Sequence, residues 1–129
     1  MKTIYQRIYE KLEQLVGDME EIPDAKKSQV PGFMDLNLDR LSTDDGATVI
    51  ALSHYYKHTS GDMIPDPDME IRVMPDRRAA EALTYQDAYA YRFVYAGAGQ
   101  LVSADLKRDL NEFLDQWLSN CLAQGHRLN

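Results

Sequence analysis

The side chains with the most scope for chemistry lie between residues 54 and 68. They combine imidazole, phenol and carboxylate groups: His54, Tyr56, His58, Asp62, Asp66 and Asp68. Side chains alternate along a strand, so the first three would share one face. Imidazole and carboxylate together suit a transition metal. We therefore predict a binding site at these six residues, with His54, His58 and Asp66 as candidate metal ligands.

The same segment permits two other interpretations. In a metal-dependent hydrolase, a carboxylate of residues 62–68 would be the general base, and His54 or His58 the general acid. In a structural interpretation, the histidines are half-exposed strand residues and the Asp-Pro pairs initiate turns. The spacing matches neither a zinc signature nor an EF-hand loop. The chain also has no nucleophile elbow, phosphate-binding loop or dinucleotide fingerprint, so we assign no catalytic residue and no cofactor.

Two further groups are expected in the core. Cys121 lies in an apolar helical stripe, near a helix C-terminus whose dipole would not activate a thiol, so we predict a small buried hydrophobe. A second group is an aromatic row, which as an alternative could form a stacking or protein-contact surface. We expect half of this row to pack under the helices: Tyr89, Tyr91, Phe93 and Tyr95, with Tyr85 nearby.

The charge balance limits the possible partners. The chain has 129 residues, with 14 Lys and Arg against 21 Asp and Glu, for a formal net charge of -7. A surface of that sign repels phosphate backbones and anionic lipid, so we expect neither nucleic acid nor membrane as a ligand. Carboxylates such as Asp35 and Asp39, with others near residues 18–24, could instead form an acidic face that imitates DNA. The alternative is an ordinary solvated surface.

Amphipathic helices are predicted at both ends of the chain. Residues 3–20 carry apolar side chains at helical spacing, and Thr3 with Gln6 forms a capping box. Residues 103–124 begin at a Ser103 cap and stop before Gly125. Their wide apolar stripe includes Trp117, which we expect to face the core as Ile8 does in the first helix.

Alternating patterns between the helices predict strands at about 33–41, 47–58, 69–74, 79–86 and 88–95. In the first strand Met34, Leu36 and Leu38 share the apolar face. Asp45-Gly46 favours a tight hairpin turn. The polar, proline-containing segments 21–32 and 59–68 are predicted as loops.

These elements predict one α+β domain over residues 1–129. We expect a two-layer sandwich, in which an antiparallel sheet of four or five strands is covered on one face by the N- and C-terminal helices. A chain of this length can bury one sizeable core without disulfides. The other face of the sheet would remain polar and accessible.

Several motifs carry a resemblance to a known family. They are His54-Tyr55-Tyr56, Gly61-Asp62-Met63, Asp66-Pro67-Asp68-Met69-Glu70, Thr84-Tyr85-Gln86-Asp87 and the closing segment 110–118. Over residues 33–125 the chain resembles a family of small bacterial domains of unknown function, often found on plasmids, phages and integrative elements. The resemblance implies an accessory role in a mobile element and brings no catalytic residue or cofactor.

The leading functional expectation is a non-enzymatic accessory factor that binds another protein. The alternatives are an acidic, DNA-mimicking inhibitor of a nucleic-acid-binding defence enzyme and the metal-dependent hydrolase described above. With no signal peptide or membrane span in the pattern, we expect a soluble cytoplasmic protein. The oligomeric state is left open.

Overall fold

The computed structural model describes all 129 residues, and its elements follow the order expected for an α+β fold. Helix α1 spans Ile4–Val16 and helix α2 spans Ala104–Gln124, with a short 3-10 helix at Pro75–Arg77. The strands between the helices are β1 (Ala25–Ser28), β2 (Leu36–Asp44), β3 (Ala47–Lys57), β4 (Met63–Met74), β5 (Ala79–Ala82), β6 (Thr84–Gln86), β7 (Tyr91–Phe93), β8 (Tyr95–Ala96) and β9 (Gln100–Leu101). Neither helix combines the length and apolar character needed to cross a bilayer.

Helix α1 begins where the sequence predicts and ends earlier. The Thr3 hydroxyl accepts the Gln6 N–H at 3.2 Å, and the Gln6 side chain accepts the Thr3 N–H at 2.9 Å, which completes the capping box. The helix stops at Val16 because Gly17 adopts φ 101°, a conformation that a right-handed helix cannot include. The predicted end near residue 20 is therefore wrong, although Met19 still packs in the core at 2% exposure.

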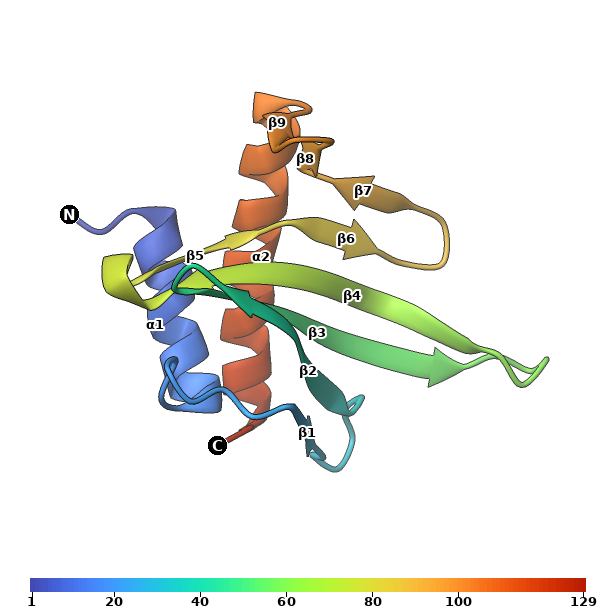
Figure 1. Cartoon of the computed structure of the whole chain (residues 1–129). Helices are drawn as coiled ribbons and strands as arrows, with labels where there is room; N and C mark the ends of the chain where they lie inside the picture. Colours follow the sequence, from blue (N-terminus) through green and yellow to red (C-terminus); the bar gives the residue numbers. More distant parts are fainter.

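The main sheet is entirely antiparallel and has seven strands, which corrects the expected four or five. The strand order is β1-β2-β3-β4-β6-β7, with β5 also paired to β4 (Figure 1). Part of the difference is an interruption at Leu83, which divides the predicted strand 79–86 into β5 and β6. The rest is β1, which lies in the predicted loop 21–32 and carries no apolar alternation that could have identified it.

Two hairpins define how far the sheet extends. The β2–β3 turn has Asp45 at φ 49° and Gly46 at φ 76°, the left-handed pair that the sequence predicts for a tight turn. The β3–β4 hairpin is longer than predicted, because β4 starts at Met63 inside the expected loop 59–68. Figure 1 shows this hairpin, drawn in green, running well past both helices.

Both helices cover one face of the sheet, as expected. The core combines α1, α2 and the inward-facing residues of β2, β3 and β4; Ile8, Leu36, Leu52 and Ile71 are 0% exposed, and Trp117 is 7% exposed. Met34, predicted to join Leu36 on the apolar face, is exposed because β2 begins only at Leu36. We call the sheet surface opposite the helices the open face.

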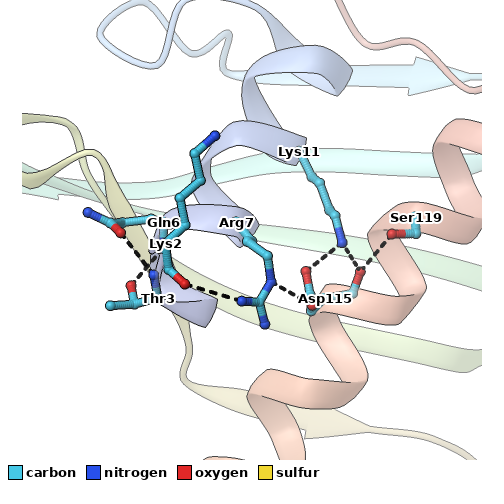
Figure 2. A network of polar contacts seen from close by, with 7 residues as sticks. All are labelled: Lys2, Thr3, Gln6, Arg7, Lys11, Asp115 and Ser119. Carbon is cyan, nitrogen blue, oxygen red and sulfur yellow. Dashed lines mark hydrogen bonds and ion pairs between the residues drawn. The ribbon is translucent and has the colours of Figure 1, made fainter.

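A polar network fixes the two helices to each other (Figure 2). Asp115 of α2 binds Lys11 of α1 at 2.5 Å and Arg7 at 3.5 Å, while Lys11 also donates to the Asp115 carbonyl at 3.1 Å. The Asp115 side chain is only 19% exposed, so water screens these pairs less than a fully exposed pair. The network joins segments that are distant in sequence and sets the spacing of the helices above the core.

Candidate functional site

The structure does not gather the predicted site residues in one place. His54 points inward and is 6% exposed, whereas Asp68, on the neighbouring strand, points to the open face and accepts the Tyr55 hydroxyl at 2.5 Å. His58 lies at the exposed end of the β3–β4 hairpin, where its Nδ1 contacts the Ser60 hydroxyl at 3.0 Å. The sheet therefore separates the His54 imidazole from Asp68, and His58 lies apart from both at the hairpin end.

The remaining members of that predicted set are all exposed. Tyr56 is 39% exposed, and the side chains of Asp62 and Asp66 lie on the surface of the projecting hairpin. No group of three or more His, Cys, Asp or Glu side chains in the chain is placed to hold a metal ion. The predicted candidate ligands His54, His58 and Asp66 therefore do not form a coordination sphere in this structure.

His54 takes part in a different, buried cluster instead. Its Nδ1 lies 2.9 Å from the Asp35 carbonyl, which can only accept, so Nδ1 carries a proton and donates it to this oxygen. Its Nε2 lies 3.9 Å from the Cys121 sulfur. A cysteine facing a histidine whose other nitrogen is held by an oxygen has the layout of a nucleophilic pair.

The burial of Cys121 argues against nucleophilic chemistry. The residue is 1% exposed, and burial raises the pKa of its thiol to about 12. A nucleophilic cysteine needs the opposite shift together with access for a substrate. We therefore interpret the pair as structural, in agreement with the prediction that Cys121 is a small buried residue.

His126 completes the buried cluster and was not identified from the sequence. Its Nδ1 lies 2.8 Å from the Ser28 hydroxyl, which also accepts the Arg127 N–H at 3.0 Å. Its Nε2 is buried without a hydrogen-bond partner. Burial, followed by the neighbouring His54, lowers the pKa of His126. The residue lies just beyond α2, where the sequence offers no pattern that predicts burial.

A groove lies on the open face, at the other side of the sheet from this cluster. We call it the β7 groove; it has a volume of about 530 Å³, and β4, β6, β7 and the β8 turn provide its walls. The side chains that matter for recognition are Glu70, Arg72, Thr84, Tyr91, Phe93 and Tyr95. Tyr91 is 56% and Phe93 42% exposed, with ring centroids 6.1 Å apart.

The exposure of these rings corrects the expectation that half of the aromatic row packs under the helices. Tyr89 is 97% exposed, and Tyr91 and Phe93 lie on the open face, opposite the helices, so neither helix covers them. Among the five aromatics only Tyr85 and Tyr95 are partly buried against the core. The alternative interpretation of the row, a contact surface, fits this geometry better.

The outer edge of β7 has unpaired backbone groups. The Asp87 N–H donates to the Ala90 carbonyl and the Val94 N–H to the Leu83 carbonyl. Hydrogen-bonded and non-hydrogen-bonded pairs alternate along an antiparallel ladder, so Arg92 hydrogen-bonds to β6. The N–H and C=O of Tyr91 and Phe93 therefore point sideways, toward the free edge of β7. No other strand or side chain binds these groups.

The other two sheet edges are protected. Strand β1 carries Lys26 and Lys27, both exposed, and charged side chains discourage pairing with a further strand. At β5, the Asn111 side chain from α2 accepts the Ala82 N–H at 2.9 Å. Only β7 combines an open edge with exposed aromatic side chains.

Comparison with known proteins places the chain in a family. A family model described as "Domain of unknown function (DUF6908)" matches residues 4–127, nearly the whole chain, which therefore belongs to this family. No curated protein and no solved structure matches the chain. The family match agrees with the resemblance to a domain of unknown function; the association with plasmids and phages stays a prediction.

Proposed function

We propose that this member of a family of unknown function is a non-enzymatic protein-interaction module that binds an extended segment of another protein along β7. The observation that carries the proposal is the unprotected edge of β7, next to the exposed rings of Tyr91 and Phe93. A bound segment would add one strand to the sheet and obtain affinity from main-chain hydrogen bonds. The adjacent groove would receive its alternate side chains.

The chemistry of the rest of the molecule supports a binding role over catalysis. The one cysteine is buried with a raised pKa, and the histidines and carboxylates predicted for a hydrolase lie on different faces or at the hairpin end. The acidic inhibitor receives less support, because several carboxylates are paired with cations of the chain itself, such as Asp115 with Lys11 and Glu13 with Arg78. An accessory role in a mobile element is compatible with a binding module and would identify the partner as a protein of that element.

A proline substitution in the edge strand β7 tests strand addition directly. Peptides would be selected on the intact protein from a random extended-peptide library, and their affinities measured by fluorescence anisotropy. Phe93→Pro removes an N–H that points to the free edge without removing a bond to β6, whereas Phe93→Ala removes only the ring. We expect Phe93→Pro to weaken the selected peptides about tenfold beyond Phe93→Ala, as expected for a lost main-chain bond with its strand geometry.

Tyr89→Ala serves as the matched control, since Tyr89 is a fully exposed aromatic outside the groove. Circular dichroism of each variant would verify that the sheet is retained. Equal peptide affinities for Phe93→Pro and Phe93→Ala, or selection of no peptide by the wild-type chain, would contradict strand addition at β7.

A further inference from the structure

We infer that the β7 groove selects a partner segment carrying an arginine, whose guanidinium group stacks on Tyr91 and Phe93 and pairs with Glu70. The inference rests on the proposed function and specifies which side chain the groove recognises. It follows from one carboxylate of the groove that has no positively charged partner, two exposed rings and the register that strand addition imposes.

Glu70 is the uncompensated carboxylate. Its backbone is fixed, because its N–H donates to the Thr84 hydroxyl at 3.1 Å and its carbonyl accepts the Leu83 N–H at 2.8 Å. Its side chain is half-buried in the groove wall and forms no ion pair or hydrogen bond within the chain. A half-buried carboxylate without a partner favours a cationic ligand.

The nearest cation in the groove is already engaged. Arg72 lies two residues along β4 from Glu70, on the same face, and pairs with Glu81 at 3.2 Å. Its guanidinium carbon also lies 5.8 Å from the centre of the Tyr95 ring. Arg72 therefore compensates Glu81 rather than Glu70, and its contact with Tyr95 illustrates the same guanidinium–ring geometry that we infer for the ligand.

Tyr91 and Phe93 supply the surface for a planar cation. Their rings lie with centroids 6.1 Å apart and planes inclined by 35°, both on the open face and in the same groove as Glu70. A guanidinium group stacks on aromatic rings and offers a fork of N–H donors that fits a carboxylate, whereas an ammonium group is a compact, strongly hydrated charge. The combination of rings and carboxylate favours arginine over lysine.

Strand addition places such a side chain at the rings, from which its guanidinium group would extend over β7 and β6 toward Glu70 of β4. Side chains of neighbouring strands that share a face lie about 5 Å apart when directly opposite. A residue of the added strand opposite Tyr91 or Phe93 therefore projects onto the open face next to the rings. The further carboxylates of that face, Asp39 and Asp68, form no ion pair and add to the negative potential.

The test compares arginine with its uncharged isostere. The intact ¹⁵N-labelled protein would be titrated with Nα-acetyl-arginine methylamide and, separately, with Nα-acetyl-citrulline methylamide, which has a similar shape and no charge. We expect arginine to shift the amide signals of Glu70, Tyr91 and Phe93 in a saturable manner and to bind about fivefold more tightly than citrulline. Glu70→Gln should reduce this ratio to about two, because the rings still attract the charged guanidinium group. Tyr89→Ala should leave the ratio unchanged.

Two results would overturn the inference: equal affinity of the wild-type protein for both probes, or a preference for arginine that Glu70→Gln does not reduce. Its failure can be distinguished from failure of the proposed function. If selected peptides respond to Phe93→Pro but contain no arginine and bind the Glu70→Gln variant normally, strand addition stands and the selectivity for arginine is wrong. If Phe93→Pro has no effect, the proposed function itself fails.

Discussion

His126 contributes a buried imidazole whose ionisation opposes folding. The groups that face it are Ser28 of β1, His54 of β3, and Met34 and Asp35 of the loop before β2. The Met34 carbonyl and the Asp35 charge favour the protonated ring, but burial and His54 outweigh them and lower the pKa. The folded protein therefore holds this ring in its neutral form.

The sign of the pH dependence follows from that shift. Above the ordinary histidine pKa of about 6.5 the ring is neutral in both the folded and the unfolded chain. Below it the unfolded chain binds a proton first, so the free energy of unfolding falls as the pH decreases through the lowered folded pKa. We expect urea midpoints measured between pH 8 and pH 5 to decrease less steeply in His126→Gln than in the wild type.

His58→Gln provides the control for this pH effect, because His58 is exposed at the end of the hairpin. Its pH profile should parallel that of the wild type. Identical slopes for His126→Gln and the wild type would show that His126 is not the titrating group.

Cys121 should be unreactive in the folded protein. Its pKa of about 12 and its 1% exposure leave almost no accessible thiolate at pH 8. We expect alkylation by iodoacetamide to be at least about a hundredfold slower in the native state than in urea. Comparable rates in the two states would instead restore His54 and Cys121 as a candidate reactive pair.

At the level of elements, Asn111 connects α2 to the edge of β5. The side chain is 0% exposed, accepts the Ala82 N–H at 2.9 Å and donates to the Lys107 carbonyl at 2.8 Å. It satisfies a strand N–H that would otherwise be buried without a partner. The same contact explains how a sheet edge beneath a helix is closed without another strand.

Removal of the Asn111 side-chain amide should therefore destabilise the folded protein. We expect Asn111→Ala to reduce the free energy of unfolding by about 1–3 kcal/mol, since it leaves a buried N–H unpaired. Asn120→Ala, at an exposed position of the same helix, should change it by less than about 0.5 kcal/mol. Chemical denaturation of both variants checks the difference, and equal stabilities would contradict this role of Asn111.

At the level of the whole molecule, the helices and the sheet are of unequal extent. The helical layer covers the core half of the sheet, while the β3–β4 and β6–β7 hairpins extend beyond it (Figure 1). The covered part is held by a buried core and by contacts such as Asp115 with Lys11 and Arg7 (Figure 2). The uncovered part is available for binding.

The network at Asp115 should make a salt-sensitive contribution to stability. We expect Asp115→Asn to lower the free energy of unfolding by about 1 kcal/mol at low ionic strength, and by less in 1 M NaCl, because salt screens the ion pairs. Asp109→Asn is the control, since Asp109 is exposed and contacts only the adjacent Arg108. A salt-independent loss in Asp115→Asn would mean that packing, rather than charge, links the helices there.

Features decided by neighbouring residues could be predicted from the sequence. The Thr3–Gln6 capping box, the Ser103 cap and the Asp45-Gly46 turn each depend on a few consecutive residues, and all three form. The periodic apolar residues also correctly placed Ile8 and Trp117 in the core beneath two helices. Local backbone preference and side-chain polarity were sufficient for these predictions, and for the α+β class that they imply.

The site depended on contacts between distant parts of the chain. His54 meets Cys121 across 67 residues and His126 meets Ser28 across 98, separations over which no periodic pattern carries information. Tyr91 and Phe93 alternate as residues of a half-buried strand do, yet they are exposed because they lie on the face of β7 that is turned away from the helices. Whether an apolar side chain is covered depends on the lengths and crossing of elements elsewhere in the chain, and only the folded arrangement sets these.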